Sequence, residues 1–178
     1  MGDILRAAFR VRGLLALEYT AEDWYNTENR GGMDMTEHII RVSDPALPLY
    51  SNLANISAVL NTMEDINWCG FYIAQGETLY VGPFQGEPAC TRIPFGKGVC
   101  GTGWAEKRTQ LVSDVHCFAG HIACDCNSNA EIVVPLLNAA GEVLGVLDID
   151  SPVSGRFDGE DLDGLEEAAA FLVKKISG

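Results

Sequence analysis

Two segments, one in each half of the chain, carry apolar residues at helical spacing. The first predicts a helix over residues 45–63, with Asp44 as its cap and Pro45 in its first turn. The predicted buried stripe of this helix consists of Leu49, Leu53, Ile56 and Leu60.

The second helix is predicted from about residue 159 to residue 175. Asp158 can cap its start, and the charges at its two ends suit the helix dipole, with acids in the first turn and lysines in the last. The predicted buried stripe of this helix is Leu162, Leu165, Ala169, Leu172 and Ile176.

Between these helices the pattern predicts short strands. Turn residues at 75–77 and 138–141 join several of them, so neighbouring strands are expected to pair as antiparallel hairpins. A short helix ending near Lys107 and an irregular loop over residues 113–130 interrupt the series. The predicted strands are 67–73, 79–81, 90–93, 110–112, 131–137 and 142–149.

This order of helix, strands and helix predicts a single α+β domain over residues 34–178. A central, mostly antiparallel sheet is expected to carry the two long helices on one face. The opposite face is then left to loops and a pocket. Residues 1–33 are interpreted as an N-terminal extension of unknown role.

Composition narrows the choice of partners. The chain has 178 residues, 47% of them hydrophobic, which suits a compact domain with its own core. Its formal net charge of −13 produces a field that repels phosphate backbones and anionic lipids, so we expect neither a nucleic-acid nor a membrane partner. Because no stretch is typical of a membrane span or a targeting peptide, a cytoplasmic location is expected.

The chain contains six cysteines: Cys69, Cys90, Cys100, Cys117, Cys124 and Cys126. A disulfide framework is not expected in a domain that is large and hydrophobic enough to fold without one. The thiols are therefore inert core residues, metal ligands or redox-active groups. Cys69, in an aromatic-rich strand, is interpreted as a core residue, whereas Cys124 lies in a polar loop that favours a reactive thiol.

Five segments carry most of the glycine, cysteine and acidic residues with candidate chemistry. They are GPFQGEPAC at 82–90, IPFGKGVCG at 93–101, GHIACD at 120–125, SNAE at 128–131 and GVLDIDS at 145–151. Together they resemble the free methionine-(R)-sulfoxide reductase family, whose scaffold is a GAF domain, over roughly residues 36–177. The resemblance implies a GAF-like fold and thiol-dependent reduction of free L-methionine (R)-S-oxide to L-methionine.

The same resemblance implies roles for three cysteines. Cys124 would be the nucleophile, Cys90 its usual resolving partner and Cys100 a second redox-capable thiol. A thioredoxin-like protein is expected to reduce the resulting disulfide, and no metal or organic cofactor is implied. The chain departs from the family pattern by adding Cys69, Cys117 and Cys126, which leaves the resolving cysteine open.

The chemistry of sulfoxide reduction points to similar residues. A thiolate that attacks the sulfur needs an acid to protonate the departing oxygen and a second thiol to condense with the sulfenic acid. His116 and His121 lie near Cys124 in the sequence and can lower the pKa of its thiol. They are explained equally well as residues that fix the loop.

Acidic and aromatic residues supply a candidate binding pocket. Asp148 and Asp150 share one face of an apolar strand, where acids are costly to bury without a cationic or hydrogen-bonding partner. We expect Glu131, Asp148 and Asp150 to bind the substrate ammonium and donate the proton, with the division of roles left open. Trp68 and Tyr72 share a strand face and are expected to hold the methyl-sulfur end.

Two other functions stay open. One is a GAF domain that binds a small molecule without turnover and needs neither Cys90 nor Cys124. The other is a metal site, although its spacing matches no paired CxxC knuckle. Its ligands would be His116, Cys117, His121, Cys124 and Cys126.

Lys97 between two glycines gives a weak signal for an anion-binding loop. The sequence leaves open whether the protein forms a homodimer.

Overall fold

The computed structural model describes residues 35–44, 46–122 and 126–176, which belong to one compact unit that begins at Met35. Its helices are α2 (Met35–Val42), α3 (Leu49–Leu60), α4 (Gly98–Glu106), the short 3₁₀ helix η2 (Val115–Cys117) and α5 (Gly159–Ile176). Its strands are β1 (Trp68–Gln75), β2 (Thr78–Gln85), β3 (Arg92–Pro94), β4 (Gln110–Val112), β5 (Ala130–Leu137) and β6 (Val143–Ser151).

The strands form one sheet in the order β3-β2-β1-β6-β5-β4, and every pairing in the described sheet is antiparallel. The pairing of β1 with β6 joins a half built from β1–β3 to a half built from β4–β6. In the first hairpin Gln75 pairs with Thr78, and Gly76 between them takes a φ of +61°, which glycine adopts readily. The predicted antiparallel sheet is therefore confirmed.

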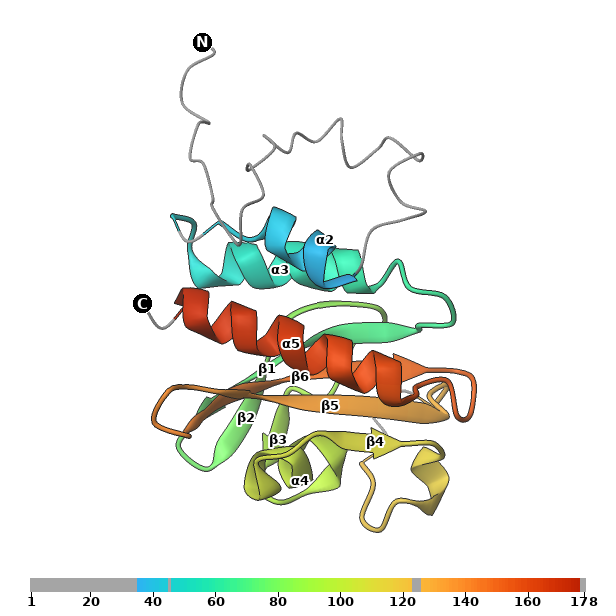
Figure 1. The fold of residues 1–178 in the computed structure, drawn as a ribbon. Helices are drawn as coiled ribbons and strands as arrows, with labels where there is room; N and C mark the ends of the chain where they lie inside the picture. Colours follow the sequence, from blue (N-terminus) through green and yellow to red (C-terminus); the bar gives the residue numbers. More distant parts are fainter. Residues whose placement is uncertain (1–34, 45, 123–125, 177–178) are drawn as a thin grey trace. The chain divides into compact units, whose positions relative to one another are not determined.

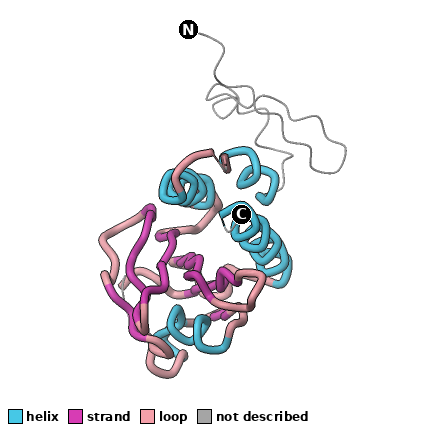
Figure 2. Tube along the Cα trace, turned by 90° about the vertical axis from the view of Figure 1, so that its left-hand side faces the viewer, coloured by secondary structure: helices cyan, strands magenta, loops and turns pink. Residues whose placement is uncertain are grey.

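The helices divide between the two faces of the sheet (Figure 1). α3 packs on β1 and β2, α5 packs on β5, and α2 lies across α3 and α5. α4 contacts the sheet from the opposite face, on the side that also carries the loop containing η2. Figure 2 shows the strands between these two layers. The predicted placement of the long helices on one face is confirmed, and the other face is covered by α4 and loops.

The first long helix begins later than the sequence predicts. α3 starts at Leu49, directly after Pro48, and proline disfavours helical backbone at the residue before it. Asp44 is not its cap; the Asp44 carboxylate accepts a hydrogen bond from the Ala46 backbone N–H in the preceding turn at 2.8 Å. Leu49 is consequently 41% exposed instead of part of the buried stripe. Pro45 lies outside the described residues.

The last helix agrees with its predicted start. The Asp158 carboxylate accepts hydrogen bonds from the backbone N–H groups of Glu160 and Asp161, at 2.8 and 3.1 Å. Leu162 is only half-buried, and the side chain of Ile176 lies outside the described set. The buried positions are Leu165, Ala168, Ala169, Leu172 and Val173. This stripe is wider than predicted because α5 packs on both β5 and α2. The sequence analysis did not predict α2, because a helix of 8 residues is too short to show a clear apolar period.

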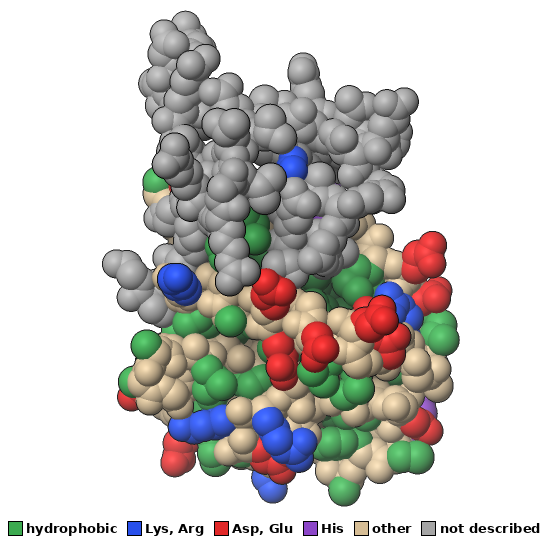
Figure 3. Space-filling model, viewed as in Figure 1, with side chains coloured by type: hydrophobic (Ala, Val, Ile, Leu, Met, Phe, Trp, Pro, Cys, Tyr) green, Lys and Arg blue, Asp and Glu red, His purple; other side chains and the backbone are tan. Residues whose placement is uncertain are grey.

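Acidic side chains gather on the surface over α5 (Figure 3). Glu160, Asp163, Glu166 and Glu167 are all exposed there. Part of the large negative charge therefore lies on the outer face of this helix, away from the buried faces of the sheet. Among the described residues, no helix combines the length and the apolar character needed to cross a membrane.

Candidate functional site

A pocket with about 350 Å³ of space, its mouth included, lies between α4, the segment after η2 and the sheet. It opens on the sheet face opposite α3 and α5, so the predicted pocket face is confirmed. The described residues that line it are Ile93, Gly98, Val99, Cys100, His121, Ile122, Ser128, Glu131, Asp148 and Asp150.

The strand register explains why three acids meet in this pocket. Asp148 and Asp150 alternate onto the same face of β6, and Glu131 on β5 pairs directly with Asp150. All three side chains are nearly buried, with relative exposures of 6% for Glu131, 6% for Asp148 and 8% for Asp150. The three acids that the sequence analysis selected are therefore brought together in one place.

The first turn of α4 places Cys100 over these acids. The Cys100 thiol donates to Glu131 Oε1 at 3.9 Å, and its sulfur lies within 4.8 Å of oxygens from both Glu131 and Asp148. Gly98 precedes it with a φ of +61°, and a Cβ there would lie 3.3 Å from the Ile122 side chain. Glycine at this position lets the start of the helix approach the pocket closely.

Burial strongly favours the protonated acids. Desolvation is the largest cause that raises the pKa of Glu131 well above its usual range, followed by the negative charges of Asp148 and Asp150. Burial also raises the pKa of Asp148 to about 6, although hydrogen bonds with Cys100 and Glu131 act in the opposite direction. Asp148 Oδ1 has no hydrogen-bond partner within the described part of the chain. The site thus offers a buried proton and an unpartnered carboxylate oxygen.

The start of α4 carries partial positive charge, opposite in sign to the buried acids. Within the described residues, nothing accepts a hydrogen bond from the backbone N–H groups of Gly98, Val99 or Cys100. The residue that caps this helix, Lys97, makes no side-chain capping bond, and the described first turn carries no acid. Free N–H groups at a helix start carry partial positive charge. The Gly-Lys-Gly segment therefore marks a helix start that lines the pocket, and three of its backbone N–H groups have no acceptor in the described part of the chain.

Two cysteines, Cys69 on β1 and Cys100 on α4, are buried thiols whose raised pKa values disfavour the thiolate form. Burial is the first cause that raises the pKa of Cys100 well above its usual range, and the charges of Asp148 and Glu131 add to it. Cys69 is 0% exposed, and its position on β1 turns it to the face that packs on α3. Burial likewise raises the pKa of Cys69. The interpretation of Cys69 as a core residue is confirmed.

The two histidines have separate places. His116 Nε2 lies 3.0 Å from Asn129 Oδ1, and the His116 backbone N–H donates to Asp114, so this residue fixes the loop and does not line the pocket. His121 does line it, with Nε2 3.8 Å from Glu131 Oε2. Burial, and secondarily the charge of His116, lowers the pKa of His121. This shift favours the neutral form of the His121 ring.

The other cysteines differ in exposure. Cys117 is exposed and donates to Asp114 Oδ2 at 3.3 Å, and this hydrogen bond is the main cause that raises the pKa of the thiol. Cys126 is exposed, whereas Cys90 is half-buried against the core cluster that contains Trp68. Cys124 lies outside the described residues. Its predicted roles as nucleophile and as disulfide partner of Cys90 stay predictions.

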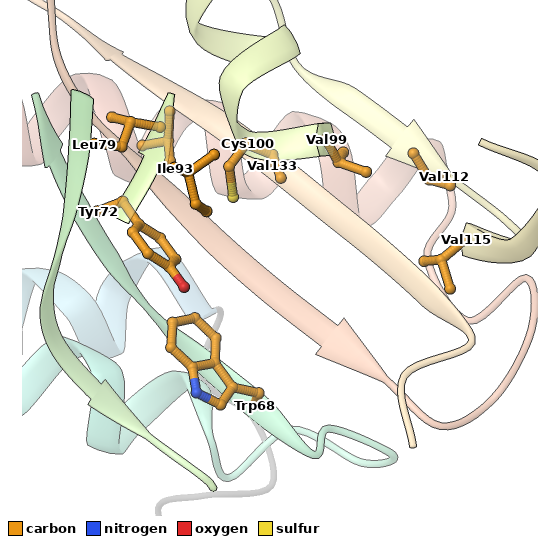
Figure 4. Packing of buried hydrophobic residues seen from close by; sticks show 10 residues of the cluster. Trp68, Tyr72, Leu79, Ile93, Val99, Cys100, Val112, Val115 and Val133 are labelled. Atoms are coloured by element: carbon orange, nitrogen blue, oxygen red, sulfur yellow. The ribbon is translucent and has the colours of Figure 1, made fainter. Parts of the chain in front are cut away.

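Trp68 and Tyr72 project from β1 on the pocket side of the sheet (Figure 4). Their rings stack with centroids 5.8 Å apart, and both are buried, with exposures of 2% and 1%. Trp68 Nε1 also donates to the Glu87 carbonyl at 3.1 Å. Neither ring lines the pocket, although Trp68 pairs with Asp150 across β1 and β6. Their contact with a methyl-sulfur group stays a prediction.

Sequence reasoning did not single out five residues that line the pocket. They are Ile93, Gly98, Val99, Ile122 and Ser128. All five lie inside the motif segments 93–101, 120–125 and 128–131, which is the signal that could have selected them. Ser128 is buried and accepts a hydrogen bond from Asn67 Nδ2 at 3.1 Å, which links the loop to the start of β1.

The donor atoms around Cys100 could also hold a metal ion. Cys100, Glu131 and Asp148 form the group of potential ligands found within the described residues. The metal site considered from the sequence is a different one. Three of its five predicted ligands have separate surroundings. Cys117 is hydrogen-bonded to Asp114, His116 is hydrogen-bonded to Asn129, and His121 lines the pocket.

Known proteins share this fold and much of this sequence. The sequence profile of the GAF domain family matches residues 48–176. A free methionine-R-sulfoxide reductase of Escherichia coli (strain K12) is 53% identical over 128 residues, covering 71% of this chain and 77% of that protein. A protein of the same name from Saccharomyces cerevisiae is 45% identical over 141 residues, covering 75% of this chain and 78% of that protein.

Solved structures give the same result. The reduced form of a free methionine-R-sulfoxide reductase of Staphylococcus aureus has a TM-score of 0.76 and 46% identity, covering 80% of this chain and 92% of that one. The enzyme of Neisseria meningitidis in complex with its substrate has a TM-score of 0.75 and 39% identity, covering 83% and 93%. The fold is that of a GAF domain. Within that class, the chain belongs to the free methionine-R-sulfoxide reductase family of oxidoreductases.

Proposed function

We propose that this protein reduces free L-methionine (R)-S-oxide to L-methionine. One observation carries the proposal: a buried carboxylate oxygen of Asp148 shares a pocket with backbone N–H groups at the start of α4, and none of these atoms has a hydrogen-bond partner among the described residues. A free amino acid carries an ammonium and a carboxylate, and these match the two poles of the pocket. The relatives in Escherichia coli and Saccharomyces cerevisiae are named for this activity.

The acidic pole would bind the ammonium. Glu131, Asp148 and Asp150 are nearly buried, and no Lys or Arg of the described residues lines the pocket. Carboxylates in such a place need a cation to offset their desolvation. An ammonium group supplies that charge and three hydrogen-bond donors, one of which suits Asp148 Oδ1.

The helix start would bind the carboxylate. Gly98, Val99 and Cys100 line the pocket, their backbone N–H groups have no acceptor among the described residues, and the helix dipole adds a positive partial charge. With its two charged groups held in this way, the substrate side chain would extend toward β1. The Trp68–Tyr72 stack lies in that direction and would contact the methyl-sulfur group.

The first chemical step would be attack of the Cys124 thiolate on the sulfoxide sulfur. A buried carboxylic acid, Glu131 or Asp148, would give a proton to the oxygen, because both have a raised pKa and still hold a proton where an ordinary carboxyl does not. The sulfoxide sulfur gains two electrons, the cysteine sulfur loses two, and the oxygen passes to the cysteine. Methionine is released and Cys124 becomes a sulfenic acid.

The second step would regenerate the thiol. The Cys90 thiol condenses with the sulfenic acid, water leaves, and a Cys90–Cys124 disulfide forms. A thioredoxin-like dithiol protein would then reduce that disulfide by exchange and return both thiols. Cys100 is buried with a raised pKa, so its thiolate is disfavoured and its role in this exchange would be secondary to that of Cys90.

The test is stereochemical. Reduced protein is incubated with racemic free methionine sulfoxide and a thiol reductant, and each epimer is followed by chiral chromatography. The proposal expects loss of the (R) epimer, persistence of the (S) epimer and an equal gain of methionine. Binding of the sulfoxide with both epimers unchanged would instead identify a non-catalytic GAF sensor.

A further inference from the structure

The atoms around Cys100 suggest a second ligand for the pocket. The Cys100 sulfur and one oxygen each from Glu131 and Asp148 lie within 4.8 Å of one another, and all three side chains are buried. His121 lies beside this group, with its Nε2 atom 3.8 Å from the second carboxylate oxygen of Glu131, Oε2. Thiolate, imidazole and carboxylate are the ligands that Zn²⁺ takes in proteins.

The distances are close to those of a tetrahedral site. Zinc bonds of about 2.0–2.3 Å place neighbouring ligand atoms roughly 3.3–3.8 Å apart. The Cys100 thiol is 3.9 Å from Glu131 Oε1, close to that spacing. The atoms of the Cys100–Glu131–Asp148 group lie at most 4.8 Å apart, so they need to close by only about 1 Å.

Asp148 gives an independent indication that a cation belongs here. Its Oδ1 atom is buried without a partner in the described part of the chain, and the residue is only 6% exposed. A buried carboxylate oxygen without a donor or a cation is costly. A mixed set of one thiol and two carboxylates selects a thiophilic divalent ion over Mg²⁺ or Ca²⁺, which prefer oxygen alone.

We propose that Cys100, Glu131 and Asp148 form a binding site for a thiophilic divalent metal ion of the Zn²⁺ class, and that the bound ion inhibits the enzyme. The ion takes the carboxylates that would hold the substrate ammonium and removes Cys100 from thiol exchange. The inhibition rests on the proposed function, whereas the binding of the metal does not.

Cobalt(II) is a spectroscopic probe for this site. Reduced, metal-free full-length protein is titrated with Co²⁺ and its absorption is recorded. We expect one ion per chain, a thiolate-to-cobalt charge-transfer band and the strong visible bands of a tetrahedral ion. Cys100→Ser should abolish the charge-transfer band. Asp148→Asn should weaken Co²⁺ binding by at least tenfold, since even partners outside the ligand set typically change affinity that much.

Cys117→Ser is the matched control, because Cys117 is an exposed thiol that bonds to Asp114 and lies outside the cluster. It should keep the full spectrum. An unchanged charge-transfer band in Cys100→Ser, or its loss in Cys117→Ser, would overturn the site. Free L-methionine is then added to the cobalt complex, and displacement of the ion supports shared carboxylates. A stable complex at saturating methionine would leave the metal site standing and refute the assignment of these carboxylates to the ammonium.

Discussion

Glu131 on β5 and Asp150 on β6 stand directly opposite one another on a buried face of the sheet. When both acids of a cross-strand pair are ionised, their like charges destabilise the sheet, and burial adds to that cost. Asp148 lies on the same face of β6, two residues before Asp150. Such an arrangement is retained in a core when it serves a ligand, so the free protein is expected to be less stable than its core alone would allow.

Removal of one buried acid should stabilise the folded protein at high pH. The pKa of Asp148 rises from 3.8 to about 6 on folding. Because the folded pKa exceeds the unfolded one, its stabilising contribution is complete below about pH 4 and is lost as pH rises through 6. At pH 8 the ionised group costs the folded state about 2–3 kcal/mol. Asp148→Asn should therefore gain that amount at pH 8 and little at pH 4, measured by urea denaturation.

The control for this prediction is Asp163→Asn, which changes an exposed acid on α5. Its effect on the free energy of unfolding should be small and nearly equal at the two pH values. If Asp148→Asn destabilises the protein equally at pH 4 and pH 8, the buried-charge account of the site is wrong.

Cys124→Ser should abolish turnover. A serine hydroxyl is not ionised near neutral pH and cannot replace a thiolate as the attacker of sulfoxide sulfur. Methionine release is measured by chromatography with a thiol reductant present. Cys117→Ser should retain the wild-type rate, because the hydrogen bond to Asp114 disfavours its thiolate. Wild-type turnover by Cys124→Ser would remove this cysteine from the mechanism.

Cys90→Ser should stop the reaction after one turnover. The sulfenic acid forms without the resolving thiol, so about one methionine per chain is released before the reaction with thioredoxin slows or stalls. Peptide mapping of the oxidised wild-type protein should find Cys90 linked to Cys124. A dominant link of Cys124 to Cys100 or Cys126 would show that another thiol resolves the intermediate.

The substrate carboxylate should matter for recognition. Hydrogen bonds to a charged group contribute about 1.5–3 kcal/mol, so the amide of methionine sulfoxide should lose roughly tenfold to a hundredfold in kcat/KM. Lys97→Ala should leave this ratio unchanged, because the proposed donors are the backbone N–H groups that follow it. If the ratio of kcat/KM for methionine sulfoxide to kcat/KM for its amide falls to near one in Lys97→Ala, the lysine side chain binds the carboxylate instead.

Local patterns predicted the sheet well for a physical reason. Strand alternation fixes which side chains share a face, so it placed Asp148 beside Asp150 and turned Cys69 to the other side. Hairpin turns fixed the neighbours along the chain. The start of α3 was wrong because Pro48, not Asp44, sets the boundary of the helix.

The pocket itself was harder to predict. The approach of the α4 start to Ile122 depends on a positive φ at Gly98, and no periodicity in the sequence encodes that contact. The same holds for His121 and Ser128, which reach the acids from an irregular loop. Motif resemblance selected these segments, whereas only the folded chain shows which of their loop and helix-start residues line the pocket.

The central claim is that the pocket recognises a free amino acid. Acetylation of the amine removes the positive charge and leaves buried carboxylates unpaired, which costs on the order of 3–5 kcal/mol. At about 1.4 kcal/mol per tenfold, kcat/KM should fall by two or more orders of magnitude. The decisive measurement is the ratio of kcat/KM for free and N-acetylated methionine (R)-sulfoxide under thioredoxin recycling. The account predicts a ratio above about one hundred, and a ratio near one would contradict it.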